Sequence, residues 1–162
     1  MEPQLLLDAA SRFAHVGTAI ALVGGSIFMR FVLMPVASQL PNDAHDQLRA
    51  GILNRWKRFV HGGIGLFLLS GFYNYMRLMG AHKGDKLWHM MVGTKILLAF
   101  VVFFIASALV GKSKSFEPLR QQRAKWLGIV VLLSLVIVGM SSFLKVRKFE
   151  PAAAEQPVKT VE

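Results

Sequence analysis

The stretch WHMMVGTKILLAFVVFFIASALV, residues 88–110, decides the fold of this chain. It is long enough to cross a bilayer as a helix, because roughly 20 residues rising 1.5 Å each span about 30 Å of hydrocarbon. Similar apolar stretches lie at about Phe13–Met34, Phe59–Met79 and Trp126–Leu144. A helix satisfies its own backbone hydrogen bonds in lipid, and no stretch alternates like a barrel strand. The sequence therefore predicts an all-α integral membrane four-helix bundle.

Composition agrees with a membrane location. Hydrophobic residues make up 54% of the 162 residues and charged residues 17%, whereas a soluble domain carries about 25% charge. The chain has no cysteine, which excludes disulfides, iron–sulfur clusters and zinc–thiolate sites. The formal net charge is +10, but the basic loops lack the interleaved aromatic residues of a nucleic-acid surface. We expect contacts with membrane lipids and none with nucleic acid.

The spans set the expected organisation. Residues 1–148 are predicted to form the transmembrane domain, and the polar tail 149–162 is predicted to be disordered. Glu2 and Asp8 stand where a signal peptide carries positive charge, so we expect an uncleaved first helix. Four spans place both ends of the domain and the connection 79–87 on one face, side A, and the connections 35–55 and 111–125 on side B. We expect a multi-pass protein of a bacterial-type inner (plasma) membrane, in either orientation.

A repeated hexamer is the most informative local pattern. Arg12-Phe-Ala-His15-Val-Gly opens the first span, and Arg58-Phe-Val-His61-Gly-Gly opens the second. Arg and His three residues apart share a helix face, so a guanidinium lies at headgroup level with an imidazole one turn deeper. This pattern favours a porphyrin site, with imidazole on the iron and arginine on a propionate. The alternative is structural: arginine anchors the helix end, histidine bonds a carbonyl, and glycine packs helices.

The two repeated histidines are expected at opposite faces. Consecutive spans run in opposite directions, so His15 lies near side A and His61 near side B, roughly 25 Å apart along the membrane normal. Two axial nitrogens on one iron are only about 4 Å apart. His15 and His61 therefore cannot bind the same haem, and the candidate companions of His15 on side A are His89 and Lys95.

Lys95 is the residue that a purely structural account explains least well. It lies about 10 Å deeper than Trp88, where a lysine costs about 1–3 kcal/mol unless it snorkels or meets an anion. No Asp or Glu lies in any of the four apolar stretches, so a bound ligand is the expected source of a carboxylate. We therefore take Lys95 as a candidate catalytic or ligand-holding residue, with snorkelling as the alternative.

A second cluster suggests a different metal. Thioether and imidazole groups near side A are soft ligands that suit copper, although methionine is also ordinary filler in apolar helices. Ser70 is expected to bond the helix backbone. The candidate metal ligands of the whole chain are His15, His61, Met76, Met79, His82 and His89.

These residues carry a resemblance to a known superfamily. Over roughly Arg12–Leu144 the chain resembles the small helical membrane proteins that include HemJ-type protoporphyrinogen oxidases and CopD-type copper-resistance domains. The likeness rests on His15 with Gly24, Gly25 and Arg30, and on the run from Trp88 through Lys95 to Leu98. His61 and its hexamer are not part of the oxidase pattern.

The resemblance implies a function and site residues. In the oxidase branch a His of the first helix and a Lys of the third are linked to haem b and substrate, and His15 and Lys95 match those positions. The leading expectation is a membrane protein that binds haem b or a related porphyrin and has a redox role in porphyrin or haem metabolism. We expect it to work alone, as a homo-oligomer or with a membrane redox partner. The alternatives are a CopD-like copper-handling protein and a structural or assembly subunit without a cofactor.

Overall fold

The computed structural model describes residues 2–147. The tail prediction for residues 149–162 and the last residue of the predicted domain lie outside this range. The described part is helical and contains no strand, so the all-α prediction is confirmed for it. The elements are α1 (Pro3–Phe28), the π-helical turn η1 (Met29–Leu33), α2 (Met34–Ala37), α3 (Asn42–Met79), α4 (Lys86–Val110), the 3-10 turn η2 (Lys114–Phe116), α5 (Glu117–Gln121) and α6 (Arg123–Val146).

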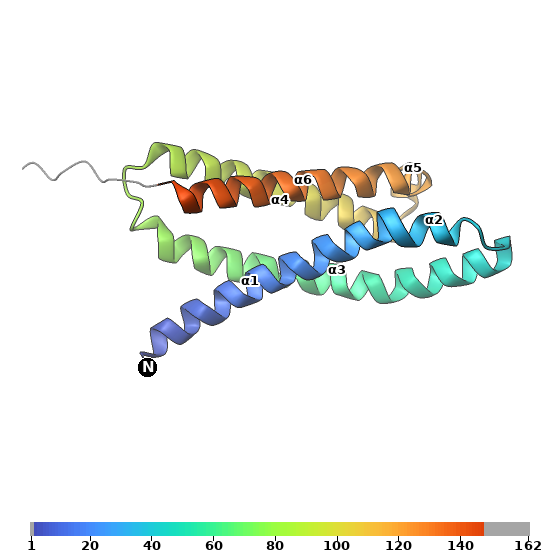
Figure 1. Ribbon diagram of the computed structural model, residues 1–162, viewed down its shortest axis with the longest axis horizontal. Helices are drawn as coiled ribbons and strands as arrows, with labels where there is room; N and C mark the ends of the chain where they lie inside the picture. Colours follow the sequence, from blue (N-terminus) through green and yellow to red (C-terminus); the bar gives the residue numbers. More distant parts are fainter. Residues whose placement is uncertain (1, 148–162) are drawn as a thin grey trace, which may run out of the picture.

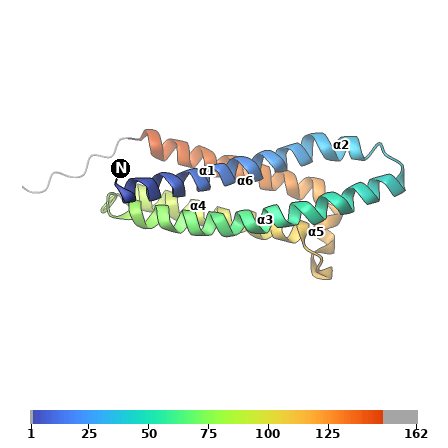
Figure 2. The same cartoon turned by 90° about the horizontal axis from the view of Figure 1, so that it is seen from below.

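Four long helices lie side by side (Figure 1). α1 packs against α3, α4 packs against α6, and the two pairs meet through α3 with α4 and α1 with α6. The start of α1, the turn between α3 and α4, and the end of α6 lie at one end of the bundle, which is side A; α2 and α5 lie at side B (Figures 1 and 2). This arrangement of the connections is the one that four alternating helices predict.

Three helical segments are long and apolar enough to cross a membrane: Pro3–Ala37, Lys86–Val110 and Arg123–Val146. The predicted span Phe59–Met79 is not among them, although it lies within the longest helix, α3. Its apolar half contains Gly62, Gly63, Gly65, Gly71, His61 and Asn74, which lower its mean hydropathy. By length and composition, three segments of the described residues are therefore candidates to cross a membrane.

Helix boundaries differ from the sequence predictions at two places. The first helix begins at Pro3 rather than Phe13, because Leu5, Leu6 and Leu7 extend it toward side A. Before Pro35 the chain makes the π turn η1, and a proline has no N–H to bond the residue four before it. The predicted connection 35–55 is helical from Asn42 onward, where it forms the first half of α3, which runs unbroken to Met79.

The hydrophobic core lies in the side B half of the bundle. Its buried members come from η1, α4 and α6: Met29, Ile105, Leu109, Leu127 and Val130. Trp56 and Trp126 are partly buried and pack against this core. The side A half of the α1–α3 pair is held together by polar contacts instead.

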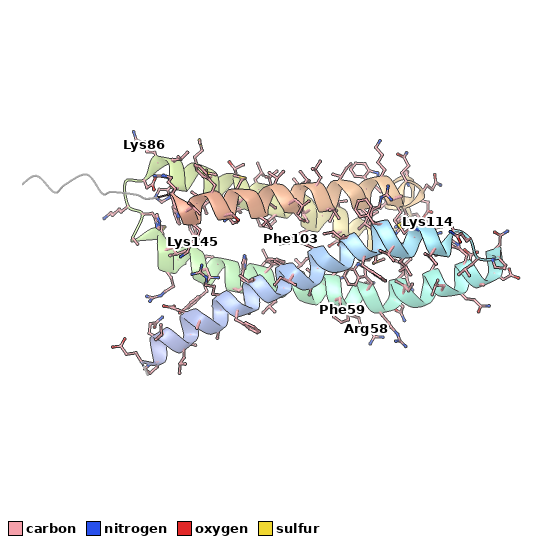
Figure 3. The ribbon with its side chains drawn as sticks, in the orientation of Figure 1. Arg58, Phe59, Lys86, Phe103, Lys114 and Lys145 are labelled. Atoms are coloured by element: carbon pink, nitrogen blue, oxygen red, sulfur yellow. The ribbon has the colours of Figure 1, made fainter. Side chains whose placement is uncertain are left out.

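The outer faces of the helices are strongly apolar. Phe13 is 81% exposed and Leu69 is 74% exposed, and many leucines and phenylalanines on every long helix are similarly uncovered. Phe59 and Arg58 point away from the bundle, whereas Phe103 lies between the two helix pairs (Figure 3). Such a surface is larger than a soluble monomer exposes and fits contact with lipid chains.

The turn between α3 and α4 is fixed by an aspartate and a glycine. Gly84 has φ +89°, a left-handed conformation that glycine adopts without strain. Asp85, which is 3% exposed, accepts a hydrogen bond from the Trp88 backbone N–H at 3.0 Å and caps α4. Both carboxylate oxygens of Asp85 also accept from Nη2 of Arg147 at 2.8 Å. The end of α6 is thereby tied to the start of α4.

Candidate functional site

A row of polar contacts joins α1 to α3 on side A. Asp8 accepts hydrogen bonds from the Tyr73 hydroxyl at 2.7 Å and from the Arg77 guanidinium at 2.9 and 3.0 Å. About one helical turn deeper, the Ser11 hydroxyl donates to Oδ1 of Asn74 at 3.2 Å. The row ends at His15, which is the deepest ionisable member and the only one carrying a lone-pair nitrogen.

His15 has a defined tautomer in this arrangement. Its Nδ1 atom lies 3.0 Å from the Ser70 hydroxyl oxygen. The single proton of that hydroxyl is donated to the Leu66 carbonyl at 2.6 Å, so the oxygen accepts and Nδ1 carries the ring proton. Nε2 is therefore left with the lone pair, which can bind a metal ion or accept a proton.

Two residues of α3 fix the imidazole plane. Phe67 meets it edge-on with ring centroids 4.8 Å apart, and Phe67 in turn contacts Phe103 of α4 at 5.7 Å. Gly71, one turn along α3 from Phe67, leaves room for the ring, because a Cβ there would lie 3.3 Å from Cε1 of His15. The ring is thus held at the junction of α1, α3 and α4.

Lys95 of α4 is an electrostatic neighbour of His15. Its side chain is half-buried, and no hydrogen-bond acceptor or carboxylate within residues 2–147 contacts its ammonium group. His15 of the first apolar stretch and Lys95 of the third are therefore close enough to interact electrostatically. A half-buried ammonium beside an imidazole can bind an acidic ligand group.

The second copy of the hexamer lies elsewhere. His61 is exposed, and its Nδ1 atom bonds the Lys57 carbonyl of its own helix at 2.8 Å. Because His15 packs at Gly71, the two histidines are offset by the rise from residue 61 to 71, about 15 Å. The expected 25 Å was too large, since α1 begins at Pro3 and places His15 well inside the helix. The offset still exceeds the spacing of two axial ligands.

Of the other predicted site residues, Arg12 lies near His15, whereas Arg58 and His89 lie away from the pair of His15 and Lys95. Arg12 is exposed one turn from His15, whereas Arg58 lies about 18 Å along α3 from Ser70. Arg58, Phe59, Gly62 and Gly63 instead line an open groove of about 390 Å³ between α1 and α3. His89 is exposed with its ring edge-on to Trp88 at 4.9 Å, about 9 Å of helix away from Lys95.

The candidate copper ligands Met76, Met79 and His82 lie at the side A end of α3 and in the turn that follows it. Met76 and Met79 are exposed on the outer face of α3. The His82 ring stacks on Trp88 at 4.5 Å and its Nδ1 atom lies 3.0 Å from the Leu78 carbonyl oxygen. Within residues 2–147 no three His, Cys, Asp or Glu side chains are gathered in a way that could hold a metal ion.

Two contributors to the site were missed by the sequence analysis. Ser70 bonds the helix backbone as expected, but it also orients His15. Phe67 reads as an ordinary lipid-facing residue in an apolar helix. The sequence signal for Ser70 and Phe67 is their spacing of three and four residues with Gly71 and Asn74. Residues so spaced share one face of a helix, and this is the face of α3 that α1 covers.

The fold and this site define a helical protein with three helices capable of crossing a membrane and a histidine–lysine pair between its helices. The chain belongs to the family of an uncharacterized protein of Aquifex aeolicus (strain VF5), to which it is 31% identical over 137 residues, 78% of this chain and 87% of the relative. No family model matches the chain, and no solved structure matches it.

Proposed function

We propose that this protein is a multi-pass inner-membrane protein that binds haem b or a related porphyrin at His15, with an oxidoreductase role in porphyrin metabolism. In this proposal α3 is the fourth span. Its glycine- and tyrosine-containing apolar half is shielded on one face by α1, so it needs less hydropathy than a helix surrounded by lipid.

The observation that carries the proposal is the hydrogen bond of His15 to Ser70. Histidines that bind metals usually donate their second ring N–H to a protein acceptor, which fixes the tautomer and raises the basicity of the ligating nitrogen. Ser70 fills that role through an acceptor oxygen at 3.0 Å. The resemblance of the His15 and Lys95 positions to the HemJ-type pattern points to the same pair.

The residues present fit one axial ligand and one carboxylate partner. His15 supplies a neutral imidazole with Nε2 available, and Lys95 supplies the cation that a propionate requires in low dielectric. Arg12 lies one turn nearer to side A, where it can reach a second propionate. A bound haem would supply one-electron chemistry. The chain itself would orient the imidazole, neutralise acidic groups and keep water from the site with Phe67 and Phe103.

The test is an absorption spectrum of protein purified in detergent, after supplementation with haem. We expect a Soret band in the parent and in His61→Ala, and its loss or a clear shift in His15→Ala. His61→Ala is the matched control because it removes an exposed imidazole from the same hexamer. Equal loss from both substitutions at one haem per chain would contradict the proposed site.

Lys95 is tested in the same way. Lys95→Met should weaken porphyrin binding by about 30-fold or more, since it leaves a ligand carboxylate unpaired. Lys95→Arg should keep the charge but not the geometry. Unchanged affinity in Lys95→Met would remove Lys95 from the site. Copper found by elemental analysis without a Soret band would instead favour the copper-handling alternative. The absence of both copper and a Soret band would favour a structural subunit.

A further inference from the structure

Arg123, the first residue of α6, is buried without a counter-charge. Its side chain belongs to the buried set, with 9% of the residue exposed. No carboxylate and no hydrogen-bond acceptor within residues 2–147 contacts its guanidinium. Removing most of an arginine side chain from water without a counter-charge is costly, and the unbonded guanidinium nitrogens keep the solvent contact through which an anion can reach them.

The groups around Arg123 are themselves positive. Arg49 of α3 and Arg120 of α5 are close enough to repel its charge. Arg120 already donates to Glu117 and to the carbonyls of Gly111 and Ser113. The Glu117 carboxylate is thereby paired with Arg120, and the side chain of Arg49 is exposed. We refer to Arg49, Arg120 and Arg123 as the side B arginine cluster.

The start of α6 adds to this positive field. Its N-cap residue, Gln122, makes no side-chain capping bond. The backbone N–H groups of the first turn therefore remain available, and they carry the partial positive charge of the helix N-terminus. Three elements, α3, α5 and α6, therefore direct positive charge to one point. That point lies one turn outside Trp126, at the end of an apolar helix that is long enough to cross a membrane.

We propose that the side B arginine cluster binds a phosphate group, and specifically the headgroup of an anionic phospholipid. Guanidinium groups bind phosphate oxygens through two parallel N–H bonds, which a buried fork such as Arg123 can supply. A headgroup phosphate lies at the depth where the apolar part of α6 ends. The cluster lies at the opposite end of the bundle from Asp8, so this site is independent of the one at His15.

Lipid titration of the purified protein tests the proposal. Protein in neutral detergent is titrated with phosphatidylglycerol, with phosphatidylcholine, or with inorganic phosphate, while the melting temperature is followed and bound lipid is counted by native mass spectrometry. We expect phosphatidylglycerol to raise the melting temperature and to remain bound, with little effect of phosphatidylcholine. Arg123→Gln should require about tenfold more phosphatidylglycerol for the same shift.

Two further variants distinguish loss of lipid binding from misfolding and from the general effect of removing one positive charge. Arg49→Gln changes an exposed member of the cluster, so it keeps the test valid even if Arg123→Gln fails to fold; it should also weaken the response. Arg55→Gln is the matched control, because Arg55 is an exposed arginine of α3 outside the cluster, and its response should equal that of the parent.

Each outcome decides the proposal. The site is overturned if both cluster variants respond to phosphatidylglycerol like Arg55→Gln. It is also overturned if phosphatidylglycerol stabilises the parent no more than phosphatidylcholine does and inorganic phosphate has no effect. If inorganic phosphate alone stabilises the parent and this effect is lost in Arg49→Gln, the phosphate site stands but its occupant is free phosphate rather than a lipid.

Discussion

Gly71 of α3 provides the space that the His15 ring of α1 occupies. A Cβ at residue 71 would lie 3.3 Å from Cε1 of His15, which is tighter than an ordinary contact. The glycine of the second helix and the histidine of the first are therefore two halves of one packing arrangement, which the linear repeat does not reveal.

Substitution of Gly71 should expose this relationship. Gly71→Ala should cost about 1–2 kcal/mol of stability, because the ring must move against Phe67 or lose its bond to Ser70. Gly65→Ala is the control, since nothing lies within 4 Å of its added Cβ, and it should be neutral or stabilising by about 0.5–1 kcal/mol. Thermal unfolding in detergent measures both. A destabilisation shared equally by the two variants would contradict the close approach.

Ser70 should control the tautomer of His15. With the Ser70 oxygen as acceptor, the parent should show a protonated Nδ1 in the nitrogen NMR spectrum of labelled histidine. Ser70→Ala removes the acceptor, so a mixture of tautomers should appear, with a cost of about 1 kcal/mol. Ser142→Ala should leave the spectrum unchanged, because that hydroxyl bonds only the Val138 carbonyl of its own helix. A parent protein with Nε2 protonated would disprove the assignment.

Acid should loosen the link between α4 and α6. Burial raises the pKa of the Asp85 carboxyl, but the hydrogen bonds from Arg147 and the Trp88 N–H outweigh this effect and hold it below its ordinary value of 3.8. A lowered folded pKa means that this contribution to stability is present above pH 3.8 and is lost as the pH falls through the folded pKa.

The Asp85 prediction is measured as melting temperature against pH. Asp85→Asn should melt lower than the parent at neutral pH and should lose less stability in acid, because the group that titrates has been removed. Asp46→Asn, at an exposed carboxylate of α3, should behave like the parent throughout. An Asp85→Asn curve parallel to that of the parent down to about pH 3 would show that the pair does not set acid stability.

Single cysteines should report the arrangement of the connections. The native chain has no cysteine, so labels at Ser38, after α2, and at Lys83, before α4, are unambiguous. Lys83 is preferred to Gly84, whose φ of +89° would strain any side chain. Membrane-impermeant reagent should reach the two positions from opposite sides of the membrane. Labelling of both from the same side would exclude α3 as a span.

The polar contacts show where prediction from sequence reached its limit. The start of α4 was predicted to within two residues, because a long, mostly apolar run begins there. The partners of Asp8 could not be predicted, since Tyr73 and Arg77 are more than sixty residues away in sequence. Likewise, the buried state of Arg123 depends on Arg49 and Arg120, which only the packing of α3 and α5 brings to it.

The sequence by itself determined the helical class, three of the four apolar segments as capable of crossing a membrane, and the order of their connections. These properties follow from local composition, because hydropathy and the backbone bonds of a helix need no distant residue. Only the tertiary structure decided that His15 meets Ser70 and Lys95 rather than His89 or His61. That choice depends on the stagger between α1 and α3, which is set by glycine spaces and polar contacts between helices.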